Sequence, residues 1–236
     1  MSHAFIPIRD EEGSILTKPT VMLSLSGGID STHCLYNLLM EKKEVVLIHH
    51  MRLYNWCGRQ SHEYRAVQNI LAWLRIHRLN HFIYEETAFD YGTCRQLLLD
   101  AAVVVFSAMA AARQYSSIER YVRCGHIGDI EYQSNRGDVY GADNEKVREE
   151  IPKLILGRRL EPIRPNKEKT KQQVISELPK DLFKLTWYCR TPMRSSFGIP
   201  CGRCKTCKEV ETALIALGRE DEIKSAAYSI DKQFNK

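Results

Sequence analysis

Long apolar runs are missing from this sequence of 236 residues. The longest, at 97–112, is interrupted by Asp100 and is shorter than the roughly 20 residues that a membrane span needs. The first residues, MSHAFIPIRDEEG, have neither the basic start nor the apolar core of a signal peptide. We therefore expect a soluble, cytoplasmic protein without a membrane partner.

Two common nucleotide-binding motifs are also missing. The sequence contains neither the G-x-x-x-x-G-K-S/T loop of many ATPases nor the G-x-G-x-x-G turn of dinucleotide-binding domains. It has no internal repeat and no low-complexity segment. These absences exclude the usual P-loop ATPases, the usual dinucleotide-binding enzymes and repeat proteins.

A strong charge of either sign is absent as well. The chain has 34 Lys and Arg against 29 Asp and Glu, a net charge of +5, which suits small anionic substrates as much as nucleic acid. There is no RNA-binding motif with interleaved aromatic residues, so nucleic acid is not an expected partner. The densest basic stretch, 164–171, is interpreted as a solvated loop that enters a helix.

Hydrophobic residues make up 44% of the chain, enough for one globular domain with a sizeable core and a small appended module. Strand-like runs alternate with helical patterns, which predicts an α/β fold: a parallel, Rossmann-like sheet with helices on both faces. The polar segment 133–145 is interpreted as a surface loop over the site, and the tail beyond residue 217 as frayed. The predicted strands are 21–25, 45–49, 81–84 and 121–124, and the predicted helices are 31–41, 62–78, 94–115 and 208–217.

A strand-to-helix turn with two adjacent glycines follows the first predicted strand. Residues 26–31 read Ser-Gly-Gly-Ile-Asp-Ser. The glycines leave no side chain between the backbone amides and an anion, and the positive end of the next helix favours phosphate. Asp30 can cap that helix or hold a magnesium ion, and the alternative to a phosphate site is a glycine turn with an Asp cap. The candidate nucleotide-binding residues are Leu25, Ser26, Gly27, Gly28, Ile29, Asp30, Ser31 and Thr32.

A second turn is expected at the same edge of the sheet. Gly125-His126-Ile127-Gly128-Asp129 follows the fourth predicted strand. In parallel sheets ligands bind beyond the carboxyl ends of the strands. The site should therefore include both turns.

Eight cysteines in a cytoplasmic chain indicate thiols or metal ligands, and not disulfides. Cys34, Cys57, Cys94 and Cys124 are scattered through helix and strand patterns and are interpreted as buried thiols. None of these four belongs to a C-x-x-C pair, so a sulfur-transfer role is not favoured.

The other four cysteines crowd the C-terminal fifth of the chain. Cys201, Cys204 and Cys207 form C-x2-C-x2-C, and Cys189 lies upstream across a loop. Four thiolates at this spacing suit one tetrahedral, structural zinc, and nearby Arg and Lys residues offset its charge. An iron–sulfur cluster is the rival, since ferredoxin-type ligation also uses C-x2-C-x2-C. We divide the chain into a nucleotide-binding domain, 1–185, and a zinc-binding module, 186–236.

The Ser-Gly-Gly-x-Asp-Ser turn resembles the signature of the PP-loop ATP pyrophosphatases, which adenylate a substrate and release pyrophosphate. With the cysteine, loop and C-G-x-C-x-x-C that follow, the chain resembles the 7-cyano-7-deazaguanine synthase family, whose fold is adenine nucleotide alpha hydrolase-like. Further positions match this family: Gln60, His62, Glu63, 101–112, Gly125, Asp129, Pro162, Lys171, Thr186 and Trp187.

The resemblance implies an ATP-dependent ligase of queuosine biosynthesis. It would adenylate the carboxylate of 7-carboxy-7-deazaguanine and convert it with ammonia to 7-cyano-7-deazaguanine (preQ0), using ATP, magnesium and zinc. Asp30 would hold magnesium clear of the core, so that Asp30→Ala leaves the fold intact. Lys171 would offset charge at the α-phosphate, and Asp129 would bind the purine-like edge or assist proton transfer. A solvated lysine and an ordinary loop cap are the alternatives for these two residues.

The chain departs from the family at three places: Tyr188, 99–100 and 133–136. Because the family places these stretches around the base pocket, the sequence does not decide which amine accepts the acyl group. The alternative is a relative that activates the same acid and joins it to a protein amine in antiviral defence. No glutaminase domain fits in this length, so the nitrogen comes from free ammonia or from a partner. The sequence does not decide whether the protein is a homodimer.

Two further alternatives need other features. A tRNA-thiolating PP-loop enzyme needs an RNA-binding surface and a reactive cysteine pair. A non-enzymatic zinc module does not need the intact Ser-Gly-Gly-Ile-Asp-Ser turn. His62 and Glu63 are explained equally well as an ordinary helix start.

Overall fold

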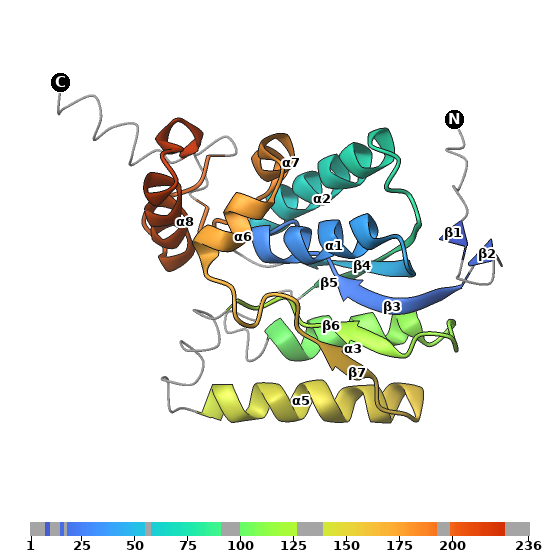
Figure 1. Ribbon diagram of the computed structural model, residues 1–236. Helices are drawn as coiled ribbons and strands as arrows, with labels where there is room; N and C mark the ends of the chain where they lie inside the picture. The colour runs from blue at the N-terminus through green and yellow to red at the C-terminus, as the bar shows by residue number, and fades with distance from the viewer. Residues whose placement is uncertain are drawn as a thin grey trace, which may run out of the picture.

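The computed structural model describes residues 8–9, 15–16, 18–54, 58–90, 100–126, 139–192 and 199–224 (Figure 1). Residues 8–9, 15–16, 100–101 and 139–145 are described by their backbone alone. Its centre is a five-stranded sheet in the order β5-β4-β3-β6-β7 in which each neighbouring pair is parallel. The strands are β3 (Pro19–Ser24), β4 (Val45–Tyr54), β5 (Phe82–Asp90), β6 (Arg120–Val122) and β7 (Glu161–Ile163). The predicted parallel α/β fold is confirmed.

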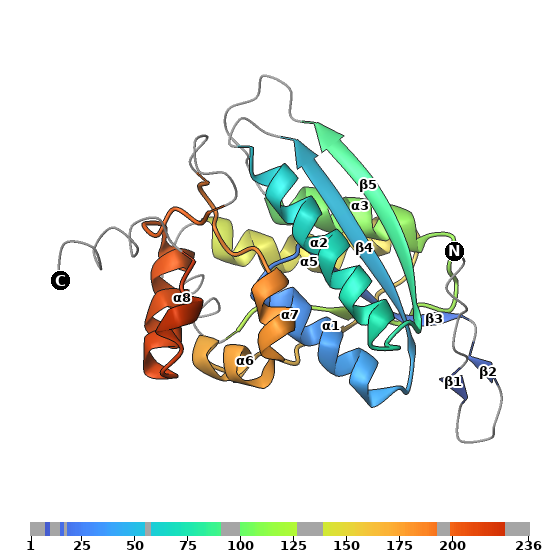
Figure 2. The ribbon, with the colours of Figure 1, turned by 90° about the horizontal axis from the view of Figure 1, so that it is seen from above.

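Helices cover both faces of this sheet (Figures 1 and 2). The main core lies on one face, where Val21 and Leu23 of β3 meet α1 (Ile29–Glu41), α2 (Arg59–Ile76), α6 (Lys171–Glu177) and α7 (Lys180–Leu185). On the other face Met22 packs on α3 (Asp100–Ala112), and α5 (Val139–Leu156) lies beyond it. Strands that are apolar at every position suit this arrangement, because successive side chains alternate between two dry faces.

The strand order changes direction at β3. From β3 the chain first builds outward through β4 and β5, then returns to the other side of β3 to build β6 and β7. The loops after β3 and β6 therefore lie at the switch point on the carboxyl edge, which is the usual ligand position in open parallel sheets. β4 and β5 pair as far as Tyr54 and Asp90, beyond the end of β3 at Ser24.

The C-terminal segment shares the main core. α8 (Lys205–Ala216) packs against α6 and lies at the end of the sheet toward which β3 points (Figure 1). Cys189, Val210 and Leu214 belong to the same buried cluster as the strands. None of the helices in the described ranges has the length and apolar character that crossing a membrane requires.

Two predictions about loops were wrong. Residues 139–145, predicted as loop, are the first part of α5, while 133–138 lie outside the described residues. Ile151 and Ile155 pack against the second core, and this contact outweighs the polar start of the helix and Pro152 within it. The predicted frayed tail is folded at residues 219–224: Arg219 is 8% exposed and donates to Glu222 at 2.7 Å.

Three short strands were not predicted. β7 has the sequence Glu-Pro-Ile, and its proline is tolerated because β7 is an edge strand. β1 (Ile8–Arg9) and β2 (Ile15–Leu16) form an antiparallel pair at the opposite end of the molecule from α8 (Figure 1). Segments of two or three residues carry no periodicity that a sequence pattern could reveal.

Candidate active site

The Ser-Gly-Gly turn, here the SGG loop (residues 25–32), joins β3 to α1 at the point where the strand order changes. Leu25 donates its backbone N–H to the carbonyl of His49, at 2.8 Å. His50 Nδ1 lies 2.8 Å from the carbonyl oxygen of Leu25, and burial lowers the pKa of His50. A neutral imidazole can donate this bond, so β4 fixes the start of the loop on both sides of Leu25.

Gly27 has a positive φ of 74° and faces α2 closely. A Cβ there would lie 2.9 Å from the Cβ of Ala66 and 3.0 Å from the carbonyl oxygen of Glu63. Both the backbone conformation and the space therefore require glycine. Gly28 is the N-cap residue of α1 with φ −79°, so the second glycine is not explained by a left-handed conformation.

Hydroxyl groups line the turn between Gly28 and the first turn of α1. The Oγ atoms of Ser26 and Ser31 lie 3.2 Å apart, and the N–H of Gly28 donates to Ser26 Oγ at 3.3 Å. Thr32 Oγ1 donates to the carbonyl of Gly28 at 2.7 Å. No side chain caps α1, so the Asp-cap interpretation of Asp30 was wrong, and the backbone amides at the N-terminus of this helix suit an anion.

Asp30 and Lys171 form an ion pair across the site. Lys171 Nζ lies 2.7 Å and 2.6 Å from the two carboxylate oxygens of Asp30, and its side chain is 6% exposed. The alternative interpretation of Lys171 as a solvated first-turn lysine was therefore wrong. So was the expectation that Asp30 stands clear of the core, because its carboxylate is the partner of a buried ammonium.

Asn166 joins three segments beside this pair and was not singled out by the sequence. Its side chain is fully buried and donates to the carbonyls of Asp30, at 3.3 Å, and Cys124, at 3.2 Å. Its Oδ1 lies 2.8 Å from Nδ1 of His33 in α1, and the other ring nitrogen of His33 lies 2.8 Å from Glu177. The basic stretch around Asn166 is solvated at Lys167 but not at Asn166 or Lys171.

The turn after β6 reaches the SGG loop, as the sequence predicted. His126 is 1% exposed, and its Nδ1 lies 3.8 Å from a carboxylate oxygen of Asp30. Its Nε2 lies 2.8 Å from a carboxylate oxygen of Glu209 in α8. The sequence analysis included this turn in the site but singled out neither His126 within it nor Glu209 in α8. Asp129 lies outside the described residues.

The segment before the first C-terminal cysteine also touches the SGG loop. Trp187 donates its backbone N–H to the carbonyl of Gly27, at 2.8 Å, and its indole N–H to the carbonyl of Cys189, at 2.9 Å. The ring of His62 stacks on Trp187 with centroids 4.3 Å apart. Glu63 pairs with Arg59 one helical turn earlier. The stacking of His62 on Trp187 is thus a contact that a plain helix start does not explain.

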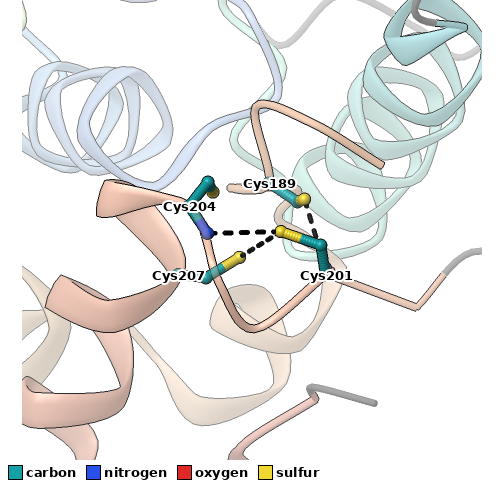
Figure 3. Close-up of side chains that lie close together, drawn as sticks. All are labelled: Cys189, Cys201, Cys204 and Cys207. Atoms are coloured by element: carbon teal, nitrogen blue, oxygen red, sulfur yellow. Dashed lines mark hydrogen bonds between the residues drawn. The ribbon is translucent and has the colours of Figure 1, made fainter. Parts of the chain in front are cut away.

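The cysteine site consists of Cys189, Cys201, Cys204 and Cys207, whose sulfur atoms lie within 4.8 Å of one another (Figure 3). Cys204 caps the N-terminus of α8, and Cys207 lies in its first turn. Backbone amides of Arg203 and Cys204 donate to Cys201 Sγ. Hydrogen bonds from Cys207 and from the amide of Cys201 lower the pKa of Cys189 to about 5, while the bond to Cys189 raises the pKa of Cys207.

The structure describes some of the remaining cysteines and family departures, and others lie outside the described residues. Cys34 in α1 forms a hydrogen bond with Cys124 after β6; this bond, and then burial, raise the pKa of Cys34. Tyr188 is 8% exposed and belongs to the main core. Residues 57, 94, 99 and 133–136 lie outside the described residues, as does the side chain of Asp100.

Gly27 provides a test of the loop geometry. We expect Gly27→Ala to lower the free energy of unfolding by about 3 kcal/mol, because a left-handed conformation and an overlap with α2 both oppose the new methyl group. Gly157→Ala is the matched control, since Gly157 has φ 70° but open space around it; it should cost about 1 kcal/mol. Denaturant unfolding measures the change in the free energy of unfolding for both variants. Equal losses would show that α2 does not constrain the loop.

Comparisons with known proteins place this chain far from characterised families. No family model matches the chain, and no curated protein does. Among solved structures it is similar to the U34-tRNA thiolase NcsA from Methanococcus maripaludis with its 4Fe-4S cluster. The TM-score is 0.48 at 14% sequence identity, over 94% of this chain and 72% of that one. At this distance the likeness carries no argument about chemistry, which must come from the site itself.

Proposed function

We propose that this chain is a PP-loop ATP pyrophosphatase that adenylates a carboxylate carried by a 7-deazaguanine. The observation that carries the proposal is the ion pair of Asp30 and Lys171 beside the SGG loop. A glycine turn alone does not explain a lysine buried at the start of a second helix, where the helix dipole disfavours a cation. A phosphate-activating site needs both a ligand for a metal and a buried cation.

The amides and hydroxyls of the SGG loop suit a departing pyrophosphate. In adenylation a carboxylate oxygen forms a bond to the α-phosphorus, and the bond to the bridging oxygen breaks with its electron pair leaving on pyrophosphate. The acid loses its charge and gains AMP as a leaving group. Magnesium, for which Asp30 is the candidate ligand, would neutralise charge on the phosphates. The first amides of α1 and the hydroxyls of Ser26 and Ser31 hold the pyrophosphate in place.

Lys171 would offset charge on the α-phosphate when Asp30 binds magnesium in place of the ammonium. In the structure both carboxylate oxygens of Asp30 accept from Lys171. If Asp30 faced a magnesium ion, the ammonium of Lys171 would be free within the same site to offset the charge that develops on the α-phosphate. The pair therefore positions the lysine before ATP binds.

The acceptor of the acyl group is an amine. Its nitrogen attacks the acyl carbon, the bond to AMP breaks, and the nitrogen loses a proton to give an amide. We propose ammonia as this amine, with a second activation of the amide oxygen that removes it and two protons to give the nitrile preQ0. Support for this finer assignment is the combination of the SGG loop with the cysteine site. The alternative is a protein amine as acceptor, with conjugation in antiviral defence.

Sulfur transfer to tRNA is a second candidate, and one observation favours it. Cys34 and Cys124 form a hydrogen bond with each other beside the SGG loop. A thiolating enzyme needs a reactive thiolate, but the raised pKa of Cys34 keeps that thiol protonated. We therefore rank carboxylate activation first.

For the cysteine site we propose a single zinc ion that Cys189, Cys201, Cys204 and Cys207 would hold. Four sulfurs at about 2.3 Å from one tetrahedral ion lie about 3.8 Å apart, and Cys201 and Cys207 have their sulfurs 3.9 Å apart. A four-iron cluster binds each cysteine to a different iron and holds the sulfurs farther apart. Zinc would supply structural cross-linking, because four thiolates leave no position for a substrate.

The ion pair of Asp30 and Lys171 can be tested for stability and chemistry separately. We expect Asp30→Ala to reduce pyrophosphate release by about a hundredfold and to cost about 3 kcal/mol of stability, because it leaves the buried ammonium of Lys171 unpaired. The double variant Asp30→Ala/Lys171→Met should regain most of the stability but none of the activity. Pyrophosphate release at the parental rate in either variant contradicts the assignment.

The metal prediction concerns composition and colour. We expect about one zinc per chain, no visible absorbance, and loss of both metal and stability in Cys204→Ala. Cys34→Ala is the control and should retain the metal, because Cys34 lies outside the cysteine site. Elemental analysis measures the metal content, and absorbance spectra distinguish zinc from iron. If the protein instead contains stoichiometric iron and shows a charge-transfer band, the site holds iron and the zinc proposal is wrong.

The substrate is tested by mass spectrometry of products. We expect AMP and pyrophosphate to form only with 7-carboxy-7-deazaguanine, and the free nitrile to appear when ammonia is added. A deazaguanine mass on a protein, without nitrile, would support the conjugating alternative. Pyrophosphate release that depends on tRNA would overturn both and favour sulfur transfer.

A further inference from the structure

α8 is placed by the cysteine site and reaches toward the SGG loop. Cys204 is the N-cap of this helix, and Cys207 lies in its first turn, so two of the four sulfurs fix where the helix begins (Figure 3). Glu209 follows two residues after Cys207. Its position relative to the sheet is therefore tied to the geometry of the cysteine site.

Glu209 is connected to Asp30 through a buried imidazole. Nε2 of His126 lies 2.8 Å from Glu209 Oε1, and Nδ1 of the same ring lies 3.8 Å from Asp30 Oδ1. Asp30 in turn contacts Lys171. These four side chains form a row that alternates between carboxylate and nitrogen groups, from α8 to the first turn of α6. His126 and Lys171 thus approach the carboxylate of Asp30 from two different elements.

A second contact joins the cysteine site to the SGG loop through the backbone. Trp187 lies two residues before Cys189, and its N–H bonds the carbonyl of Gly27 at 2.8 Å. Its indole N–H bonds the carbonyl of Cys189 at 2.9 Å. The side chain is 9% exposed and stacks on His62 of α2. The loop is therefore held at Gly27 by a residue near the cysteines, and at Asp30 it meets His126, which pairs with Glu209 of α8.

We infer that the cysteine site positions the SGG loop for magnesium and ATP, with Glu209 and His126 as positioning residues that set the orientation of the Asp30 carboxylate. The inference rests on the proposed function. A metal ligand must be oriented before the ion arrives, and the groups behind the ligand do this in other metal sites. Lys171 alone holds Asp30 from one side, and His126, oriented by Glu209, limits its rotation from the other.

Glu209→Gln and Glu211→Gln form a matched pair for the test. Both residues lie in α8 and are partly buried, but Glu211 pairs with Lys208 of the same helix, whereas Glu209 pairs with His126. Each purified variant is first checked for its metal content and melting temperature. Calorimetric titration with ATP then gives the dissociation constant over a series of magnesium concentrations, and amide hydrogen exchange is followed in the peptide that covers residues 25–32.

We expect Glu209→Gln to retain the metal and the fold, but to weaken magnesium-dependent ATP binding about tenfold and to speed exchange in the SGG loop. Glu211→Gln should behave as the parent. His126→Asn should show the same weakening, and it serves as the second variant if Glu209→Gln does not fold. In an Asp30→Asn background, Glu209→Gln should have no further effect, because both changes act on the same carboxylate.

The outcomes separate this inference from the proposed function. If the parent does not bind ATP with magnesium, the proposed function fails and the inference with it. If the parent binds but Glu209→Gln and His126→Asn bind equally well, the inference alone is overturned. Additive effects of Glu209→Gln and Asp30→Asn would also overturn it, since they would mean that Glu209 acts through the general stability of the fold.

Discussion

A buried ion pair between the first turns of two helices organises this site. Asp30 and Lys171 are 141 residues apart in the chain, and the position of Lys171 is unfavourable for its side chain without Asp30. A lysine that is 6% exposed would lose its hydration without compensation, and the N-terminus of α6 repels a cation. The pair therefore fixes α6 against α1, and with it the segment that returns from the edge strand β7 to the centre of the sheet.

The SGG loop depends on contacts from three sides. β4 binds Leu25, α2 leaves no room for a side chain at Gly27, and Asn166 holds the carbonyl of Asp30. None of these contacts comes from the loop itself. An anion-binding loop must keep its amides free for the ligand, so its own shape has to be set by groups behind it.

The cysteine site and the five-stranded sheet share one hydrophobic core in the described residues. Cys189 and Cys207 are in the same buried cluster as Val21 and Leu23, and Trp187 bridges the cysteines to Gly27. A metal that closes the cysteine site would therefore stabilise the core of the whole domain. A change at the cysteine site would therefore reach the SGG loop through this shared core.

The sequence by itself determined the parallel α/β fold, the strand-to-helix position of the SGG loop and the grouping of four cysteines. These depend on local patterns: apolar runs, adjacent glycines and C-x2-C spacing. The tertiary structure decided the burial of Lys171, the roles of Asn166 and His126, and the helix at 139–145. These depend on which distant segments meet, and a polar side chain looks the same in sequence whether it faces water or a buried partner. Only the folded chain, by removing water from Lys171 and His126, shows which polar residues serve the site.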